Sequence, residues 1–526
     1  MMSWVRDTVL TLPGVSCTFL LLLALIFIKI VHKLWWTPTR TKRFMASQGI
    51  RGPSYRLIHG NNKEISNMLK EAMSRPIPNL SHDVLSAVQP HIHSWTKSYG
   101  KNYLQWYGLQ PVLVITEPEL GKEILNNKDR VYTKQKPSIY VKKLFGDGIS
   151  MAEGEKWSKL RKISNHAFHG DSLKGVGFCL SMIPDMIASA ETMLEGWKKH
   201  EGKEIEVCEH FRLLTSEVIS RTAFGSSYLE GKNIFDMLMK LSSVIFKNAH
   251  KLRVPGISKF YKTSDEKESE KLEKGIGDTI LEIVKKRERE AVTGEEGSFG
   301  TDFLGLLLKA SHATNDKQRI SVNELVEECK TFYFAGQETN NSLLVWTVFL
   351  LALHPEWQEE ARKEVLQLFG KKTPNPDGLA KLKTMSMIIN ESLRLYPPAI
   401  ALVRRVDKEV KMGNLIIPAN VELLVSILAL HHEPQFWGQE VKHFKPERFS
   451  KGVASATNNN MAAFLPFGMG PRTCVGLNFA TIEAKIALSM ILQRYSFTLS
   501  PAYVRSPFQF LTVRPQHGLQ VILHSV

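Results

Sequence analysis

The feature that most constrains this chain is a glycine-rich loop with one cysteine, FGMGPRTCVG at Phe467–Gly476. Glycines at this density allow a tight turn that brings backbone N–H groups close to a single atom. If that atom is the sulfur of Cys474, the N–H groups can hydrogen-bond a thiolate, and the positive end of a helix expected over Leu477–Leu492 points at it. A buried structural cysteine is the alternative interpretation. With no second cysteine nearby, a bound metal fits haem iron with one axial thiolate better than a cysteine-rich zinc site.

The order Phe-Gly-x-Gly-x-Arg-x-Cys-x-Gly resembles the cysteine loop of the cytochrome P450 family at every defining position. The resemblance implies that Cys474 is the axial ligand of haem b and that Phe467 and Arg472 contribute to binding this cofactor. It also implies a mostly α fold, the cytochrome P450 fold, with a small β-rich subdomain. In that fold the haem lies between a long central helix and the helix that follows the cysteine.

A long apolar stretch over Val322–His354 is predicted to be this central helix, and its middle reads Ala-Gly-Gln-Glu-Thr. A glycine and a polar pair cost stability in so apolar a helix, which indicates a function. The hydroxyl of Thr339 can bond back to a preceding carbonyl and open the helix locally, making room for a small ligand and a water.

The same segment matches the family motif Ala-Gly-x-Asp/Glu-Thr residue for residue. The resemblance implies that Ala335 and Gly336 contact the cofactor and that Thr339 and Glu338 are catalytic. The threonine would help in handling oxygen, and the acid would pass protons inward. Asn340 departs from the threonine or serine that is common in the family, which can change the water network.

Further cofactor contacts follow from the same resemblance. Trp157 and Arg161 lie one turn apart on a helix expected over Glu155–Phe168, and in the family this pair binds a haem propionate. Arg404 matches a further propionate ligand, although Arg405 beside it could compete for the role.

A Glu-x-x-Arg motif and a Pro-Glu-Arg-Phe motif occur before the cysteine loop in the order typical of the family. The resemblance implies that Glu391, Arg394 and Arg448 form a buried structural cluster rather than a catalytic one. His431–Glu433 looks like a metal triad, but neighbouring side chains do not converge on one ion, so we interpret it as a loop.

The N-terminus carries a predicted membrane anchor, since Val9–Ile28 are almost wholly apolar and long enough to cross a bilayer. A cleaved signal peptide is the rival interpretation, but it would have a shorter apolar core and a basic start. Cations instead follow the span, at Lys29 and Lys33, which leaves the remainder in the cytosol. We predict a single-pass protein of the endoplasmic reticulum membrane whose catalytic domain faces the cytosol.

Three parts of the chain are expected: the anchor at 1–31, a basic hinge containing Gly and Pro at 32–60, and a cytochrome P450 catalytic domain at 61–526. Within the last part, Tyr103–Trp106 and Pro111–Thr116 predict a β-hairpin. Residues 419–430 predict a buried strand or short helix. Pro507–Phe510 and Leu519–Leu523 suggest a terminal hairpin that reaches back to the pocket.

The net charge limits the kinds of partner that the chain can bind, and the cysteine content indicates its redox compartment. The formal net charge of +16 is explained by solvated basic faces or, as functional interpretations, by a membrane-facing surface and an acidic protein partner. No basic arm with a nucleic-acid-binding motif accompanies it, so we expect no nucleic acid ligand. Five scattered cysteines, an odd number, argue against a disulfide framework and for a reducing compartment.

The Gly-Ile-Arg-Gly-Pro segment at 49–53, the central Ala-Gly-Gln-Glu-Thr and the Leu-His-His at 430–432 resemble plant clan 72 of the family. Its members oxidise isoprenoid hormones, terpenoids, including triterpenoids, and fatty acids. The resemblance implies a monooxygenase that uses O2 to hydroxylate a lipophilic small molecule. Electrons would come from NADPH through NADPH–cytochrome P450 reductase, with cytochrome b5 as a second candidate donor, because the chain has no flavin or dinucleotide fingerprint. Lys156, Lys159 and Lys162 are candidates for the surface that docks the reductase.

Two other classes of function stay open. One is a haem isomerase or dehydratase that rearranges a pre-oxidised substrate without oxygen, and the intact Glu338-Thr339 pair speaks against it. The other is a non-catalytic membrane protein that binds haem, for which the apolar lining expected at Ala399–Val403 would be unnecessary. NADPH consumption with added reductase separates all three.

Overall fold

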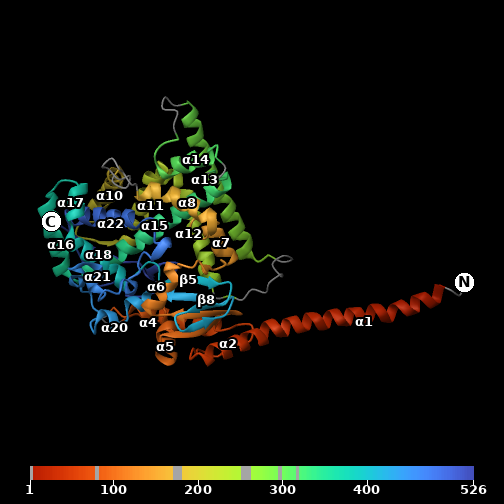
Figure 1. The fold of residues 1–526 in the computed structure, drawn as a ribbon. Coiled ribbons are helices and arrows are strands. Elements are labelled where there is room, and N and C mark those ends of the chain that lie inside the picture. The colour runs from red at the N-terminus through yellow and green to blue at the C-terminus, as the bar shows by residue number, and fades with distance from the viewer. Residues whose placement is uncertain are drawn as a thin grey trace.

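The N-terminus forms a helical arm that projects from the body of the molecule (Figure 1). The computed structural model describes residues 4–77, 82–169, 181–249, 251, 262–293, 299–315 and 319–526, with side chains from Thr18 onward. Helix α1 (Trp4–Val31) continues through a π-helical turn at His32–Trp36 into α2 (Thr37–Ser47). The part from Thr18 is long and apolar enough to cross a bilayer, and its most apolar window is not buried. The arm therefore fits the predicted anchor, although helix also occupies the first half of the predicted hinge.

The Gly/Pro segment after α2 docks on the body instead of hanging free. The backbone N–H of Leu104 donates to the carbonyl of Arg51 at 2.9 Å. A Cβ on Gly52 would lie 1.8 Å from the carbonyl oxygen of Leu104, so only glycine fits this approach. Met45 at the end of α2 is fully buried. The second half of the predicted hinge is thus part of the packed domain.

A five-stranded sheet forms the main β-rich part, in the order β1-β2-β8-β5-β3. The predicted hairpin is present as β1 (Asn102–Tyr107) and β2 (Gln110–Ile115), which pair antiparallel. The segment 419–430 contains both predicted alternatives, since β8 (Glu422–Ser426) pairs parallel with β2 and leads into the short helix α19 (Ile427–His431). β5 (Ala401–Val406) then pairs antiparallel with β8 and with β3 (Tyr132–Lys134).

The helical part is built around α15 (Val322–Leu353), the predicted central helix. It begins at a capping box, in which the Ser321 hydroxyl accepts from the N–H of Glu324 and the Glu324 carboxylate accepts from the N–H of Ser321. Most of its residues are buried all round, because other helices pack on several faces. Its neighbours include α11 (Val207–Phe224) and α22 (Leu477–Leu492), the helix that follows the cysteine loop. Figure 1 shows α15 running through the interior between these helices.

The remaining elements surround this core. The other helices are α3 (Asn62–Met73), α4 (Val84–Val88), α5 (Pro90–Tyr99), α6 (Pro118–Asn126), α7 (Ile139–Phe145), α8 (Gly154–His169), α10 (Ile183–Trp197), α12 (Tyr228–Asn248), α13 (Ser264–Thr293), α14 (Phe303–Ser311), α16 (Pro355–Phe369), α17 (Pro376–Lys381), α18 (Lys383–Leu395), α20 (Pro434–Trp437) and α21 (Gly452–Ala456). The other strands are β4 (Glu204–Glu206), β6 (Val410–Met412), β7 (Leu415–Ile417), β9 (Tyr495–Leu499), β10 (Pro507–Gln509), β11 (Val513–Pro515) and β12 (Gln520–Ser525).

The prediction for the terminal hairpin was wrong in its pairing. β10 pairs with β11, whereas β12 pairs with β9 and with β4. The short chain between β10 and β11 allows a tight turn, so β10 pairs with the strand that follows it next in the sequence. The hairpin β10–β11 still reaches α15, because the indole N–H of Trp346 and the hydroxyl of Ser342 both donate to the carbonyl of Val513.

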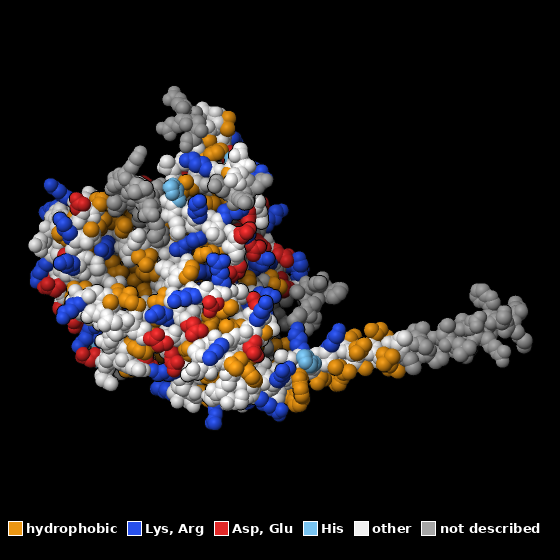
Figure 2. All heavy atoms as spheres, viewed as in Figure 1, with side chains coloured by type: hydrophobic (Ala, Val, Ile, Leu, Met, Phe, Trp, Pro, Cys, Tyr) orange, Lys and Arg blue, Asp and Glu red, His pale blue; other side chains and the backbone are white. Residues whose placement is uncertain are grey.

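The surface of the body carries mixed charges, and apolar side chains line the arm (Figure 2). Exposed apolar residues on the arm include Phe19, Leu21 and Phe27. Among the described side chains, Cys208, Cys329 and Cys474 are free thiols. Cys17 and Cys179 lie outside the described side chains.

Candidate active site

A cavity of about 320 Å³ separates the middle of α15 from the cysteine loop. The α15 side contributes Thr331, Phe332, Ala335, Gly336, Thr339, Asn340 and Leu343. The opposite side contributes Phe467, Gly468, Arg472, Cys474, Gly476, Phe479 and Ala480. The remaining walls are mostly apolar, with Phe168, Ile219, Leu393, Pro398, Ala399 and Leu402 among them. The structure therefore brings the two main sequence motifs to opposite sides of one apolar chamber.

The cysteine loop has a backbone that presents the sulfur of Cys474 to this chamber. Gly470 adopts a φ of 76°, and a Cβ there would lie 2.5 Å from the carbonyl oxygen of Leu125, so glycine is required. The N–H of Cys474 donates to the carbonyl of Phe467 at 2.8 Å and closes the loop. Arg161 fixes the neighbouring residue, since its Nη1 donates to the carbonyl of Thr473 at 2.5 Å.

The electrostatics at the sulfur are a balance of opposed effects. Burial raises the pKa of the Cys474 thiol, whereas the backbone N–H of Gly476 and the charge of Arg161 act to lower it. Metal binding removes a thiol proton and keeps the thiolate form. A bound metal ion would supply the positive charge that keeps this sulfur in the thiolate form.

Three cations line another part of the cavity wall: Lys134, Arg404 and Arg472. Lys134 and Arg404 stand directly opposite each other on β3 and β5, an arrangement of like charges that is destabilising without a counter-ion. Burial, followed by the charges of Arg404 and Arg472, lowers the pKa of Lys134 to about 7. Burial and Arg472 lower the pKa of Arg404 to about 10.

One carboxylate, that of Glu153, contacts two members of this cluster of cations. Glu153 binds Nη2 of Arg472 at 2.7 Å and accepts from the backbone N–H of Lys134 at 2.7 Å. In the described part of the chain, Lys134 and Arg404 form no ion pair. Two negative charges would balance these two cations, and haem b carries two carboxylates. The residues at both ends of the cavity therefore fit haem, with the thiol for its iron and the cations for its propionates.

The predicted cofactor-binding cations and Trp157 divide into two groups. Arg404 and Arg472 line the cavity, whereas Trp157 and Arg161 lie behind its wall. Trp157 supports Arg472, whose guanidinium carbon lies 4.5 Å from the indole ring centre. The competing Arg405 turns to the other side of β5, where it binds Asp407 at 3.1 Å. Because successive side chains of a strand point to opposite faces, Arg404 lines the cavity and Arg405 does not.

Lys134 is the member of this cluster that sequence reasoning missed. It stands in an irregular stretch and belongs to none of the family motifs. The signal that identifies it is its register opposite Arg404, which becomes visible only once β3 is paired with β5.

The polar residues in the middle of α15 are arranged differently from the prediction. The hydroxyl of Thr339 donates to the carbonyl of Ala335 at 2.7 Å, which is the expected back-bond. However, α15 continues as one α-helix through this point, so the expected local opening is not observed. A Cβ on Gly336 would lie 2.7 Å from the Ile219 side chain, which would have to move to admit a larger residue.

Glu338 is not among the described residues that line the cavity. Its carboxylate is fully buried and accepts from Thr512 at 2.6 Å and from Nε of Arg514 at 2.8 Å, on the far side of α15. Adjacent side chains on a helix diverge by about 100°. Thr339 faces the cavity, whereas Glu338 faces the β10–β11 hairpin through its bonds to Thr512 and Arg514.

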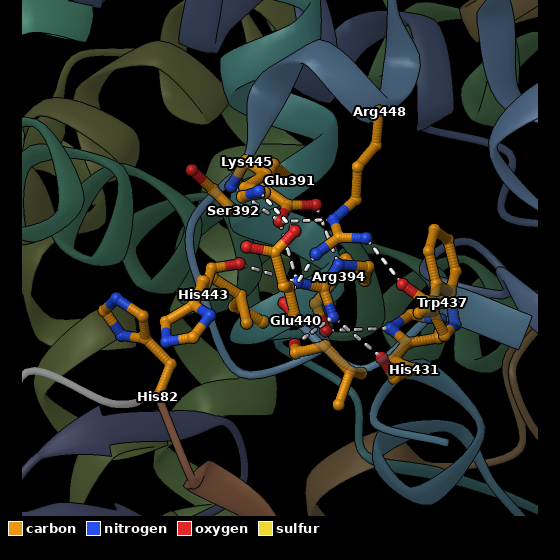
Figure 3. A network of polar contacts seen from close by, with 12 residues as sticks. His82, Glu391, Ser392, Arg394, His431, Trp437, Glu440, His443, Lys445 and Arg448 are labelled. Atoms are coloured by element: carbon orange, nitrogen blue, oxygen red, sulfur yellow. Dashed lines mark hydrogen bonds and ion pairs between the residues drawn. The ribbon is translucent and has the colours of Figure 1, made fainter. Parts of the chain in front are cut away.

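The predicted Glu–Arg–Arg cluster is present, with Glu391 and Arg394 buried and Arg448 partly buried (Figure 3). Nη2 of Arg394 lies 2.7 Å from Oε1 of Glu391, with both side chains fully buried, and Arg448 Nε lies 3.5 Å from the same carboxylate. Arg394 also donates to the carbonyl of His431 at 3.0 Å. The ring of His431 accepts from the N–H of Leu465 at 2.9 Å, just before the cysteine loop. His431 is thus a structural link and not a metal ligand, and no group able to hold a metal through His, Cys, Asp or Glu clusters occurs among the described residues.

We expect Lys134→Met to weaken haem retention without unfolding the protein. A hydrogen bond to a charged group contributes about 1.5–3 kcal/mol, so haem affinity should fall by about 10-fold to 100-fold. The measurement is the rate at which haem passes from the folded holoprotein to an excess of a haem-scavenging protein. Lys136→Met is the matched control, since Lys136 is exposed two residues further along. Equal haem loss from the two variants would contradict a role for Lys134.

Comparison with known proteins agrees with this geometry. The family model described as Cytochrome P450 matches residues 75–523. The chain is 57% identical over 528 residues to Cytochrome P450 CYP749A22 of Panax ginseng, covering 99% of each chain. It is 42% identical over 510 residues to 11-oxo-beta-amyrin 30-oxidase of Glycyrrhiza uralensis, covering 94% of this chain and 95% of the relative. It is 39% identical over 528 residues to Cytochrome P450 734A1 of Arabidopsis thaliana, covering 99% of this chain and 97% of the relative.

Proposed function

The chain belongs to the cytochrome P450 family, whose members are monooxygenases that bind haem through a cysteine thiolate, and we propose that it hydroxylates a polycyclic terpenoid, with a triterpenoid as the first candidate. The overall reaction takes the substrate, O2, NADPH and a proton to the hydroxylated product, water and NADP⁺. The observation that carries the proposal is the apolar chamber between Thr339 and Cys474. The 11-oxo-beta-amyrin 30-oxidase among the relatives supports the choice of a triterpenoid.

The chamber has the properties that such a substrate needs. Aromatic and aliphatic side chains make up most of its walls, so a rigid hydrocarbon frame is bound by burial of its apolar surface. The few polar groups are Thr339 and Asn340 on one side and the cations around Arg404 on another. Isoprenoid hormones and fatty acids are the other substrate classes that this chamber would accept.

When bound, haem supplies the oxidising chemistry, and the residues of the chain hold it and control protons and water. The Cys474 sulfur would hold the haem iron, and Lys134, Arg404 and Arg472 would bind the propionates. Thr339 Oγ1 holds a proton at the cavity wall. Glu338 belongs to the route by which protons approach α15, from the side of Thr512 and Arg514 rather than from within the cavity.

The test is substrate-dependent turnover in a reconstituted membrane. The full-length holoprotein and NADPH–cytochrome P450 reductase are placed in phospholipid vesicles, and triterpenoids, other terpenoids and fatty acids are screened for a shift of the Soret band. Compounds that bind are then incubated with NADPH under labelled oxygen. We expect a product that gains one labelled oxygen atom. A product isomeric with its substrate, formed without NADPH, would instead support a haem isomerase.

The arm is proposed to anchor the protein in the endoplasmic reticulum membrane, with the body in the cytosol. Removal of residues 1–31 is expected to release most of the protein from membranes and to leave haem binding intact. The cut spares Met45, which is buried in the core. The measurements are the membrane-bound fraction after flotation and the spectrum of the reduced carbon monoxide complex. Loss of haem binding by the soluble truncated chain would show that the arm is part of the fold.

The reductase is proposed to dock near α8, where basic residues lie behind the cysteine loop. Lys162 is exposed on this helix, one residue after Arg161, which contacts Thr473. The reductase-supported rate should fall as ionic strength rises, because salt screens charge attraction between proteins. Lys162→Glu should lower the rate several-fold at low salt, whereas Lys240→Glu, exposed on α12, should not. A rate independent of salt would contradict this surface, and cytochrome b5 is tested in the same assay.

A further inference from the structure

Two carboxyl groups lie fully buried without an ion pair in the described part of the chain, Glu328 on α15 and Glu483 on α22. Burial raises the pKa of each to about 8, so both are largely neutral at pH 7. Glu328 accepts a hydrogen bond from the backbone N–H of Ile149, a residue of the cavity wall. Glu483 instead accepts a hydrogen bond from a side chain.

A side-chain hydrogen bond joins Glu483 of α22 to the central helix α15. Its Oε2 accepts from Nδ2 of Asn340, and its Oε1 is buried without a hydrogen-bond partner. Asn340 follows Thr339 directly and lines the cavity, although its side chain is almost completely buried. This bond therefore joins α15 next to Thr339 with α22, the helix that begins three residues after Cys474.

The charged side chains around α22 bind other groups, so they do not replace Asn340 as the hydrogen-bond partner of Glu483. On α16, Arg362 donates to the carbonyls of Leu492 and Tyr495. On α18, Arg394 binds Glu391. Lys485 of α22 itself donates to the carbonyl of Leu379, and Arg494 after the helix binds Glu191 of α10. A buried carboxyl with one amide partner gains its hydrogen bond only when the two helices keep their present register.

We propose that Glu483 is a positioning residue that acts through Asn340 and fixes α15 relative to the cysteine-loop helix, so that Thr339 stays aligned above Cys474. The inference rests on the proposed monooxygenase function and adds to it a pair of residues that controls coupling between NADPH consumption and product formation. A displacement of about 1 Å between reacting groups can cost about 10²-fold in rate. The hydrogen bond between Asn340 and Glu483 would therefore fix the relative position of the two helices more specifically than apolar packing alone.

The first experiment reads the hydrogen bond itself. The carbonyl stretching band of a neutral carboxyl moves to higher frequency when it loses a hydrogen bond, and infrared spectra of the full-length holoprotein detect it at pH 7. The band of Glu483 is assigned by its loss in Glu483→Gln, and that of Glu328 by its loss in Glu328→Gln. We expect the Glu483 band to rise in frequency in Asn340→Leu, whose side chain has no hydrogen-bond donor. A band unmoved by Asn340→Leu would overturn the proposal.

The second experiment measures product, NADPH and peroxide with a substrate that the parent turns over. Glu483→Leu and Asn340→Leu should lower product per NADPH about 10-fold, part of the loss that a misalignment can cause. Glu483→Gln should restore coupling, because its amide oxygen still accepts from Asn340 and its charge equals that of the neutral acid. Glu328→Gln is the matched buried control and should remain coupled.

The outcomes separate this inference from the proposed function. If Glu483→Gln is as uncoupled as Glu483→Leu, Glu483 supplies a proton rather than a position, and the proposal is wrong. If both leucine variants remain coupled, the link is irrelevant. A parent that forms no product with any compound would refute the proposed function, while the infrared result would still decide whether Asn340 binds Glu483.

Discussion

Replacing Cys474 with serine is expected to abolish product formation and to remove the long-wavelength band of the reduced carbon monoxide complex. A hydroxyl is a far weaker donor to iron than a thiolate, and it keeps its proton at neutral pH. The loop should persist, because its closing bond runs from the backbone N–H of residue 474 to the carbonyl of Phe467. The measurements are that spectrum, the haem content and the rate of NADPH-dependent product formation.

A second cysteine provides the control for this experiment. Cys208 is partly buried near the start of α11, and burial raises the pKa of its thiol well above the usual range. Cys208→Ser should therefore keep the thiolate spectrum and the activity. If the band of the carbon monoxide complex survived in Cys474→Ser, another residue would ligate the iron and the assignment of the site would fail.

The parts of the site that depend on local sequence were predictable. The loop around Cys474 needs glycines at fixed positions, because Gly470 meets the carbonyl of Leu125 and adopts a positive φ. A requirement of this kind is written in consecutive residues, so the sequence displays it. The same holds for the capped start of α15 at Ser321 and for the hairpin of β1 and β2.

The parts that depend on pairing between distant segments were not predictable. Lys134 joins the site only because β3 lies beside β5, and no motif records this pairing. The partner of β10 was misjudged for the same reason, since strand pairing is decided by the chain between the strands and by the surrounding core. The direction of Glu338 required knowing which face of α15 meets the cavity and which meets Thr512.

The link between Asn340 and Glu483 shows how a departure from a motif gains meaning in three dimensions. In the sequence, Asn340 is only an unexpected residue after Thr339. In the structure its amide satisfies a carboxyl that would otherwise be buried without a partner, which is costly. The longer side chain of asparagine, compared with threonine or serine, can bridge the two helices at this point.

Thr339→Ala is expected to uncouple NADPH consumption from hydroxylation. Its hydroxyl lines the cavity and donates within its own helix to the carbonyl of Ala335, so its removal should leave the haem site and substrate binding unchanged. What is lost is a proton-holding group at the wall, and such groups commonly contribute about 10²–10⁴-fold to rate. NADPH should still be consumed and reduced oxygen should leave as hydrogen peroxide, while product falls.

Two further variants make this result specific to the position. Thr347 lies on the same buried helix and makes the same kind of back-bond, to the carbonyl of Leu343 at 2.8 Å, but it is not among the residues lining the cavity. Thr347→Ala should therefore remain coupled, and Thr339→Ser should recover most of the product because it restores the hydroxyl. A haem isomerase would show no NADPH demand and no response to Thr339→Ala. NADPH, peroxide and product are measured together, and an alanine variant as tightly coupled as the parent would remove Thr339 from the mechanism.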